Sequence, residues 1–128
     1  AETNDVYSAM TGLELAQVFA DKGDLAGAEK ALTDALAKAK TVDLQDVINL
    51  RLARIQLALG NADAAIASVA KIQGKSWQAT AQDVRGDALL HKGDKSGAKA
   101  AYTQGLESEG SQSLRGILTL KLNNVSNS

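Results

Sequence analysis

The positions of small, polar and apolar residues repeat three times along the chain. The stretches that carry this pattern are KGDLAGAEKAL at 22–32, LGNADAAIASV at 59–69 and KGDKSGAKAAY at 92–102. Each contains a glycine followed by aspartate or asparagine, then an alanine five residues after the glycine and a larger apolar residue four positions later. The glycines stand at 23, 60 and 93, so they are separated by 37 and 33 residues. A repeat of this length predicts similar structural units stacked in chain order.

A helical pattern precedes each of these glycines. A small residue lies seven positions before the glycine, at Ala16, Ala53 and Gly86. This spacing is typical of the tetratricopeptide pattern, in which a unit of about 34 residues forms a helix–turn–helix. Small side chains let the two helices approach closely, and the glycine can adopt a positive φ that ends the first helix. The residues expected to cap the second helices are Asp24, Asn61 and Asp94.

We therefore predict an all-α fold, a tetratricopeptide-like right-handed α-solenoid with three helix pairs and a C-terminal capping helix. Residues 1–128 should form a single domain, with repeats at about 8–40, 44–74 and 77–108 and a capping helix at about 112–124. The expected helices of the repeats run near 5–22, 25–40, 44–59, 62–72, 77–91 and 95–108. Asp43 and Ser76 are the expected caps of the third and fifth helices.

The stretch QSLRGILTLKLNN at 112–124 predicts a last helix that is apolar on one side. That side would consist of Leu114, Ile117, Leu118, Leu122 and Val125. A solenoid leaves its last repeat half exposed, so a helix of this kind is expected to close it. Its outer face would carry Arg115, Lys121 and Asn123.

Composition narrows the classes of partner. The 128 residues are 45% apolar and carry 14 basic and 15 acidic side chains, which gives a formal net charge of −1. No block of like charge appears, so neither nucleic acid nor an anionic membrane surface is expected as the main ligand. The absence of cysteine excludes disulfides and thiolate chemistry. No stretch of about 18 apolar residues is present to span a bilayer.

In this fold the first helix of each repeat lines a concave groove that serves recognition. We expect partner binding at the groove positions of the pattern. These are Met10, Leu13, Gln17, Val47, Leu50, Arg51, Arg54, Leu57, Asp83 and Asp87.

Arg51 and Arg54 interrupt an otherwise apolar helix and allow two interpretations. In the first, Asp83 and Asp87, four residues apart on the next first helix, hold the arginines in an ion-pair network that fixes helix register. In the second, the guanidinium groups bind a carboxylate or backbone carbonyl of a ligand, because their planar shape suits such partners. The two interpretations are compatible with each other.

The sequence offers no catalytic set. His91 is the only histidine and lacks a neighbouring nucleophile, while Asp83 and Asp87 look equivalent rather than tuned to different tasks. No phosphate-binding glycine loop is present. We therefore expect no enzyme activity, no cofactor and no metal. The clamp by which some tetratricopeptide domains hold acidic C-termini of cytosolic chaperones is also missing, because its positions carry Leu13, Gln17, Leu50 and Arg54.

Three longer stretches suggest a particular family. LELAQVFADKGDL, VINLRLARIQLALGNADAAI and RGDALLHKGDKSGAKAAY, together with the ending LKLNNVS, closely resemble the C-terminal domain of the YfgM family of Gram-negative bacteria. The resemblance covers about 4–126. It implies a periplasmic repeat domain of an inner-membrane protein whose transmembrane anchor this chain lacks, so we expect an excised domain.

The resemblance also implies partners. Members of the family associate with the Sec translocon and with PpiD, a membrane-anchored periplasmic chaperone related to prolyl isomerases. The leading functional hypothesis is therefore a protein–protein interaction module that links the translocon to periplasmic chaperones. The alternative is a structural tetratricopeptide scaffold for another assembly, for example a cytosolic one.

Overall fold

The computed structural model describes the backbone of residues 2–127 and the side chains of residues 5–127; residues 1 and 128 of the predicted domain lie outside this range. The described residues contain α-helices and two short 3₁₀ turns and no strand, which confirms the all-α prediction. The elements are α1 (Glu2–Asp21), α2 (Leu25–Lys38), α3 (Val42–Ala58), α4 (Ala62–Ala70), η1 (Lys75–Trp77), α5 (Gln78–His91), α6 (Lys95–Glu107), η2 (Ser111–Leu114) and α7 (Arg115–Ser126).

The turn inside each helix pair follows the repeated glycine. Gly23, Gly60 and Gly93 have φ values of 81°, 84° and 85°, a conformation that side chains with a Cβ rarely adopt. The next residue then caps the second helix through its side-chain oxygen. Asp24 accepts a hydrogen bond from the N–H of Gly27, Asn61 from Ala64 and Asp94 from Gly97. The three predicted caps are confirmed.

The predicted caps of the third and fifth helices are wrong. Thr41, two residues before Asp43, caps α3 by accepting a hydrogen bond from the N–H of Leu44. Ser76 lies inside η1, and α5 begins without a side-chain cap. Before α5 a tertiary contact is present instead: the buried carboxylate of Asp46 on α3 accepts hydrogen bonds from the N–H groups of Gln73 and Gly74. This contact holds the connection before α5 in place of a local cap.

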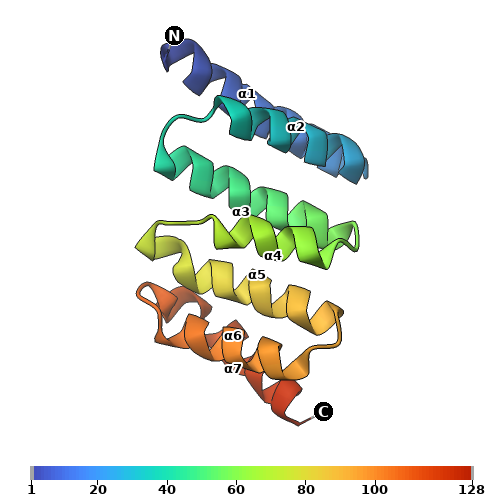
Figure 1. The fold of residues 1–128 in the computed structure, drawn as a ribbon, viewed down its shortest axis with the longest axis vertical. Helices are drawn as coiled ribbons and strands as arrows, with labels where there is room; N and C mark the ends of the chain where they lie inside the picture. Colours follow the sequence, from blue (N-terminus) through green and yellow to red (C-terminus); the bar gives the residue numbers. More distant parts are fainter. Residues whose placement is uncertain (1, 128) are drawn as a thin grey trace.

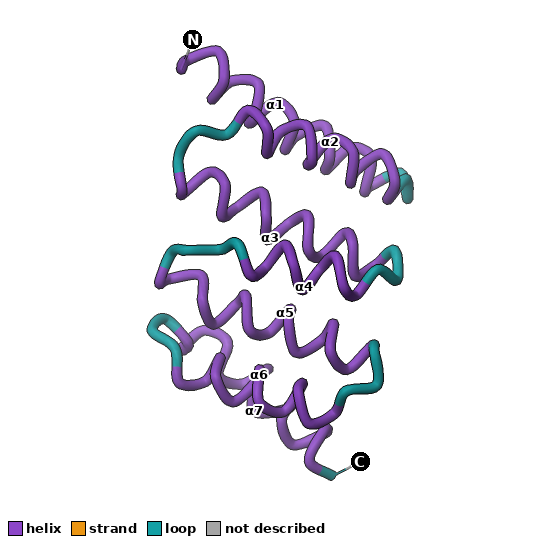
Figure 2. The backbone as a smooth tube through the Cα atoms, viewed as in Figure 1, coloured by secondary structure: helices purple, strands orange, loops and turns teal. Residues whose placement is uncertain are grey.

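The helices stack in chain order from the N-terminus to the C-terminus (Figure 1). Each pair, α1 with α2, α3 with α4 and α5 with α6, forms extensive contacts, and the second helix of each pair packs on the first helix of the next. Short loops connect them (Figure 2). The core is divided accordingly into three clusters, one around α1, α2 and the start of α3, one between α3, α4 and α5, and one beneath α7. This arrangement is an α-solenoid.

Helix α7 closes the stack with a narrower apolar face than the sequence predicts. Leu118 and Val125 are buried, and Leu114 and Leu122 are half-buried. Ile117, expected on this face, is 41% exposed. One residue along an α-helix turns the side chain by about 100°, so Ile117 points well away from Leu118 and its contact with α6.

The small residues of the pattern occupy the tight helix contacts. Ala16 and Ala53 are buried, and so is Gly86. A Cβ atom on Gly86 would stand 2.3 Å from Cε1 of the Tyr102 ring, which is fully buried on α6. The hydroxyl of Tyr102 donates a hydrogen bond of 2.7 Å to Asp87, so the ring has little freedom to move aside. Glycine at position 86 therefore sets how closely α5 and α6 pack.

We expect Gly86→Ala to lower the free energy of unfolding by roughly 1–3 kcal/mol, the usual cost of overpacking a core. The loss would occur although alanine is intrinsically the better helix former by about 1 kcal/mol. Urea denaturation followed by circular dichroism measures it. Gly116→Ala is the matched control, because a Cβ on Gly116 of α7 meets no atom within 4 Å. Equal stability changes in the two variants would show that Gly86 is not a packing constraint.

Candidate functional site

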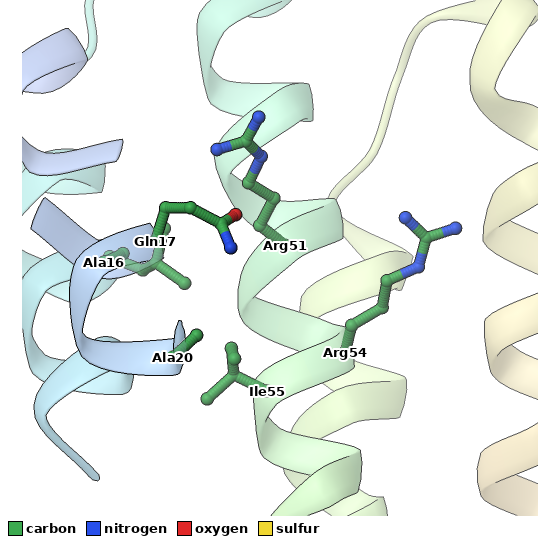
Figure 3. A pocket seen from close by; sticks show the side chains of 7 residues that line it. Ala16, Gln17, Ala20, Arg51, Arg54 and Ile55 are labelled. Atoms are coloured by element: carbon green, nitrogen blue, oxygen red, sulfur yellow. The ribbon is translucent and has the colours of Figure 1, made fainter. Parts of the chain in front are cut away.

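A cleft opens between the first helices of the first two repeats. Its volume is about 330 Å³. It is lined by Ala16, Gln17 and Ala20 of α1, Leu32 of α2, and Arg51, Arg54 and Ile55 of α3. We call it the arginine cleft. Figure 3 shows Arg51 extending on the side of Gln17 and Arg54 extending away from α1, with the alanines and Ile55 below them.

The structure exposes only part of the predicted groove. Met10, Gln17, Arg51 and Arg54 are exposed, and Leu13, Val47, Leu57 and Asp87 are half-buried. Leu50 is only 5% exposed, because it packs in the core cluster between α3, α4 and α5. Asp83 is buried as well. Leu50 and Asp83 therefore present little surface to a partner, contrary to the prediction.

The expected ion pairs between the arginines and the aspartates of α5 are absent. Lys121 of α7 donates instead to Oδ1 of Asp83 at 2.8 Å and to Oδ2 of Asp87 at 3.0 Å. Among the described residues, neither Arg51 nor Arg54 makes an ion pair or a side-chain hydrogen bond. The reason is that the closing helix α7 brings its own cation to α5, where Lys121 bonds to both aspartates.

This result also corrects the position predicted for Lys121, which was the outer face of the last helix. Lys121 follows Leu118 by three residues and precedes Val125 by four, so all three lie on one side of α7. Arg115 and Asn123 are exposed as predicted. The helical spacing of Lys121 was a signal in the sequence for this position. Its cationic head group nevertheless suggested a position exposed to solvent.

The described residues contain no group of three or more side chains placed to hold a metal ion. Within the same part of the chain, no helix combines the length and the apolar character needed to cross a membrane.

Comparison with known proteins shows which family has this architecture. Residues 1–127 match the family described as tetratricopeptide repeat-like domain. The chain belongs to this family.

Three relatives identified by sequence comparison share one name. The chain is 44% identical over 126 residues to the ancillary SecYEG translocon subunit of Escherichia coli strain K12, covering 98% of this chain and 61% of that protein. It is 32% identical over 125 residues to the protein of the same name from Haemophilus influenzae, with 98% and 61% covered. The relative from Aggregatibacter actinomycetemcomitans is 33% identical over 119 residues, with 93% and 58% covered. The chain thus spans about three fifths of these relatives, which agree with the resemblance to the YfgM family.

The side of the solenoid formed by the first helices is the one that we predict to serve recognition. The two ends of that side differ. Over α5 it is occupied by Lys121 of α7, which bridges Asp83 and Asp87. Between α1 and α3 it remains open as the arginine cleft. A second cleft of about 460 Å³ lies beside the lysine bridge, lined by Asp87, Leu90, Lys95, Tyr102, Lys121, Asn124 and Val125.

The groups around Lys121 hold one another in defined protonation states. Burial raises the pKa of Tyr102 strongly, and the hydrogen bond to Asp87 raises it further, so the phenol keeps its proton and donates it. Burial alone lowers the pKa of Lys121, but its hydrogen bonds to Asp83 and Asp87 outweigh this effect and raise the pKa above the ordinary lysine value. The cluster is thus a charged lysine between two carboxylates, which ties α7 to α5.

We expect Lys121→Met to lower the free energy of unfolding by about 1–3 kcal/mol, because it leaves two carboxylates close together without their cation. Chemical denaturation at neutral pH measures the loss. Arg115→Met on the exposed side of α7 should stay within roughly 0.5 kcal/mol of the unchanged chain.

The stability difference between the unchanged chain and the Lys121→Met variant should also depend on pH. A raised pKa of Lys121 in the folded state means that its stabilisation is complete below the ordinary lysine pKa and is lost as pH rises through the higher folded value. As pH rises from neutral, the stability difference between the unchanged chain and Lys121→Met should therefore stay constant at first and shrink in strongly alkaline solution. A difference that already disappears near neutral pH would contradict the lysine bridge.

Proposed function

We propose that this chain is a non-catalytic protein–protein interaction module of an ancillary Sec translocon subunit. In this role it lies in the periplasm of a Gram-negative bacterium, attached to the inner membrane through a segment outside this chain, and links the translocon to a PpiD-like periplasmic chaperone. The observation that carries the proposal is the arginine cleft, which leaves two cations without partners on the recognition side of a repeat fold.

The chemistry of this surface supports protein binding. Arg51, Arg54 and Gln17 supply polar contacts, while the exposed Met10 and the half-buried Val47 are apolar groove positions on the same two helices. Arginine and methionine are both enriched in protein interfaces. A surface that mixes polar and apolar side chains in this way is therefore suited to binding a protein. Leu50, counted as part of the binding surface by its spacing, is instead buried in the core cluster between α3, α4 and α5.

A non-catalytic role is supported by the state of the acidic groups. Asp83 and Asp87 are the pair of carboxylates that the sequence analysis considered for acid–base chemistry. Both accept hydrogen bonds from Lys121, and Asp87 also accepts one from Tyr102. A general base needs a carboxylate that is free to take a proton from a substrate. These two are engaged in holding α7.

The translocon and the chaperone come into the proposal from the relatives and from the resemblance. Each of the three relatives is named an ancillary SecYEG translocon subunit. The chain aligns with the greater part of those proteins, so a function carried by their repeat region is the one it is expected to share. The chaperone partner rests on the resemblance to the YfgM family alone.

The test is site-specific photo-crosslinking with the purified chain and solubilised E. coli inner membranes that contain SecYEG and PpiD. A photoreactive residue at position 17 or 54, on the arginine cleft, should give crosslinks to a translocon subunit or to PpiD. The same residue at position 99 or 115 is the control, because Lys99 and Arg115 are exposed on α6 and α7 away from the cleft. Circular dichroism melts confirm that each variant is folded.

The pattern of crosslinks decides between surfaces. Products from positions 17 and 54 alone support the proposal. Products from positions 99 and 115 alone would move the binding site to the C-terminal helices. If no position captures a translocon subunit or the chaperone, the proposed function is wrong.

A further inference from the structure

We infer that the arginine cleft binds an acidic segment of its protein partner, with two carboxylate side chains on Arg51 and Arg54 and an aliphatic side chain on the apolar floor between α1 and α3. This inference rests on the proposed function and adds the chemistry of the partner. It is argued below from the charge of the cleft, from its floor and from the directions of the two guanidinium groups.

The charge of the cleft is unbalanced. Its seven lining residues include two cations and no anion, although the chain as a whole has a net charge of −1. Three lysines outside the cleft form ion pairs: Lys30 with Asp34, Lys92 with Asp63, and Lys121 with Asp83 and Asp87. A local positive surface on a slightly acidic protein attracts acidic partners and repels basic ones.

The carboxylates closest in sequence to the cleft residues of α1 leave the arginines unpaired. Asp21 accepts a hydrogen bond of 2.8 Å from the side-chain amide of Gln17. Glu14, one helical turn before Gln17, makes no ion pair with either arginine. Forming an ion pair with a partner would therefore break no existing ion pair of Arg51 or Arg54.

The floor of the cleft is apolar and small. Ala16 and Leu32 are almost completely buried, and Ala20 and Ile55 are half-buried beside them. Two of these four side chains are methyl groups, which leaves room above them. The volume of about 330 Å³ is at the lower end of ligand pockets, which are commonly about 300–1,000 Å³. A floor of this size suits one aliphatic side chain of a peptide.

The directions of the arginines favour carboxylate side chains over a free C-terminus. A single terminal carboxylate is held best by donors that converge on one point. Here Arg51 extends toward the side of Gln17, whereas Arg54 extends away from α1 (Figure 3). The amide of Gln17 is already engaged with Asp21, and the remaining clamp positions carry Leu13 and Leu50, which have no donor. Two diverging guanidinium groups fit two carboxylates spaced along one segment.

The experiment is NMR titration of the ¹⁵N-labelled chain with short peptides that are acetylated and amidated. One set carries two glutamates at varied spacing around a leucine in a glycine–serine background. A second set has glutamine and a third has lysine in place of glutamate. A fourth is the glutamine set with a free C-terminal carboxylate. Millimolar peptide concentrations reveal weak binding, and the backbone amides that shift locate it.

We expect the acidic set alone to shift the amides around Gln17, Arg51 and Arg54, with weaker binding at high salt. The variant with Arg51→Glu and Arg54→Glu should bind roughly tenfold more weakly or worse, because two charge-assisted contacts are reversed. The variant with Lys99→Glu and Arg115→Glu changes net charge equally and should bind as the unchanged chain does. If the first variant is poorly folded, glutamine at both arginine positions replaces glutamate.

Every other pattern overturns the inference. Equal binding of the acidic and glutamine sets, preference for the free C-terminus, shifts confined to other helices, equal loss in both charge-reversal variants, or no binding by any set would each do so. These failures are distinguishable from failure of the proposed function. Crosslinks from positions 17 and 54 to translocon components could persist while the acidic peptides show no preference, and then only the chemistry assigned to the partner is wrong.

Discussion

Two helices can pack side by side in this chain only if the backbone reverses within a few residues and nothing bulky lies between them. Gly23, Gly60 and Gly93 provide the reversal with their positive φ values, and the following aspartate or asparagine starts the next helix by capping it. Ala16, Ala53 and Gly86 provide the close contact. Because both requirements recur at a similar interval, the helix pairs are alike and can stack only as a solenoid.

The stack of helices has two ends, and they differ in how far their apolar residues are covered. At the C-terminal end, α7 buries Leu118 and Val125 against the last pair and brings Lys121 to the aspartates of α5. At the other end, Leu15 and Val18 of α1 are each 47% exposed. The closing helix thus engages Asp83 and Asp87 of the third repeat, whereas Arg51 and Arg54 of the second repeat stay exposed.

This distribution of charge leaves the arginines of α3 exposed, whereas the lysine of α7 is paired. A lysine can reach into a half-buried site and form single hydrogen bonds to two carboxylates, as Lys121 does. Arg51 and Arg54 lie farther along the solenoid from that site and keep their planar donors toward the solvent. An internal cation serves α5, and external cations lie on α3. Both follow from the same helix spacing, and they differ in whether a later helix covers the position.

Much of the fold follows from residues that are close in sequence. A positive φ at glycine, a cap three residues from the N–H that it accepts, and small residues at helical spacing are local requirements, so the three helix pairs could be predicted from the pattern alone. The exposed site residues Gln17, Arg51 and Arg54 were predicted in the same way. The cap of the fifth helix was not predicted correctly, because Ser76 lies inside η1 and Asp46 holds Gln73 and Gly74 from 27 and 28 residues away.

The tertiary structure alone decided which groove positions are available. Leu50 occupies a groove position by its spacing, but contacts from α4 and α5 bury it. Asp83 and Asp87 could have paired with the arginines of α3, yet their cation comes from Lys121, which is 38 and 34 residues away along the chain. Helical periodicity tells which side of its own helix a residue occupies. Which distant helix covers that side depends on packing among all the helices, so the sequence determined the repeat and the packing determined the site.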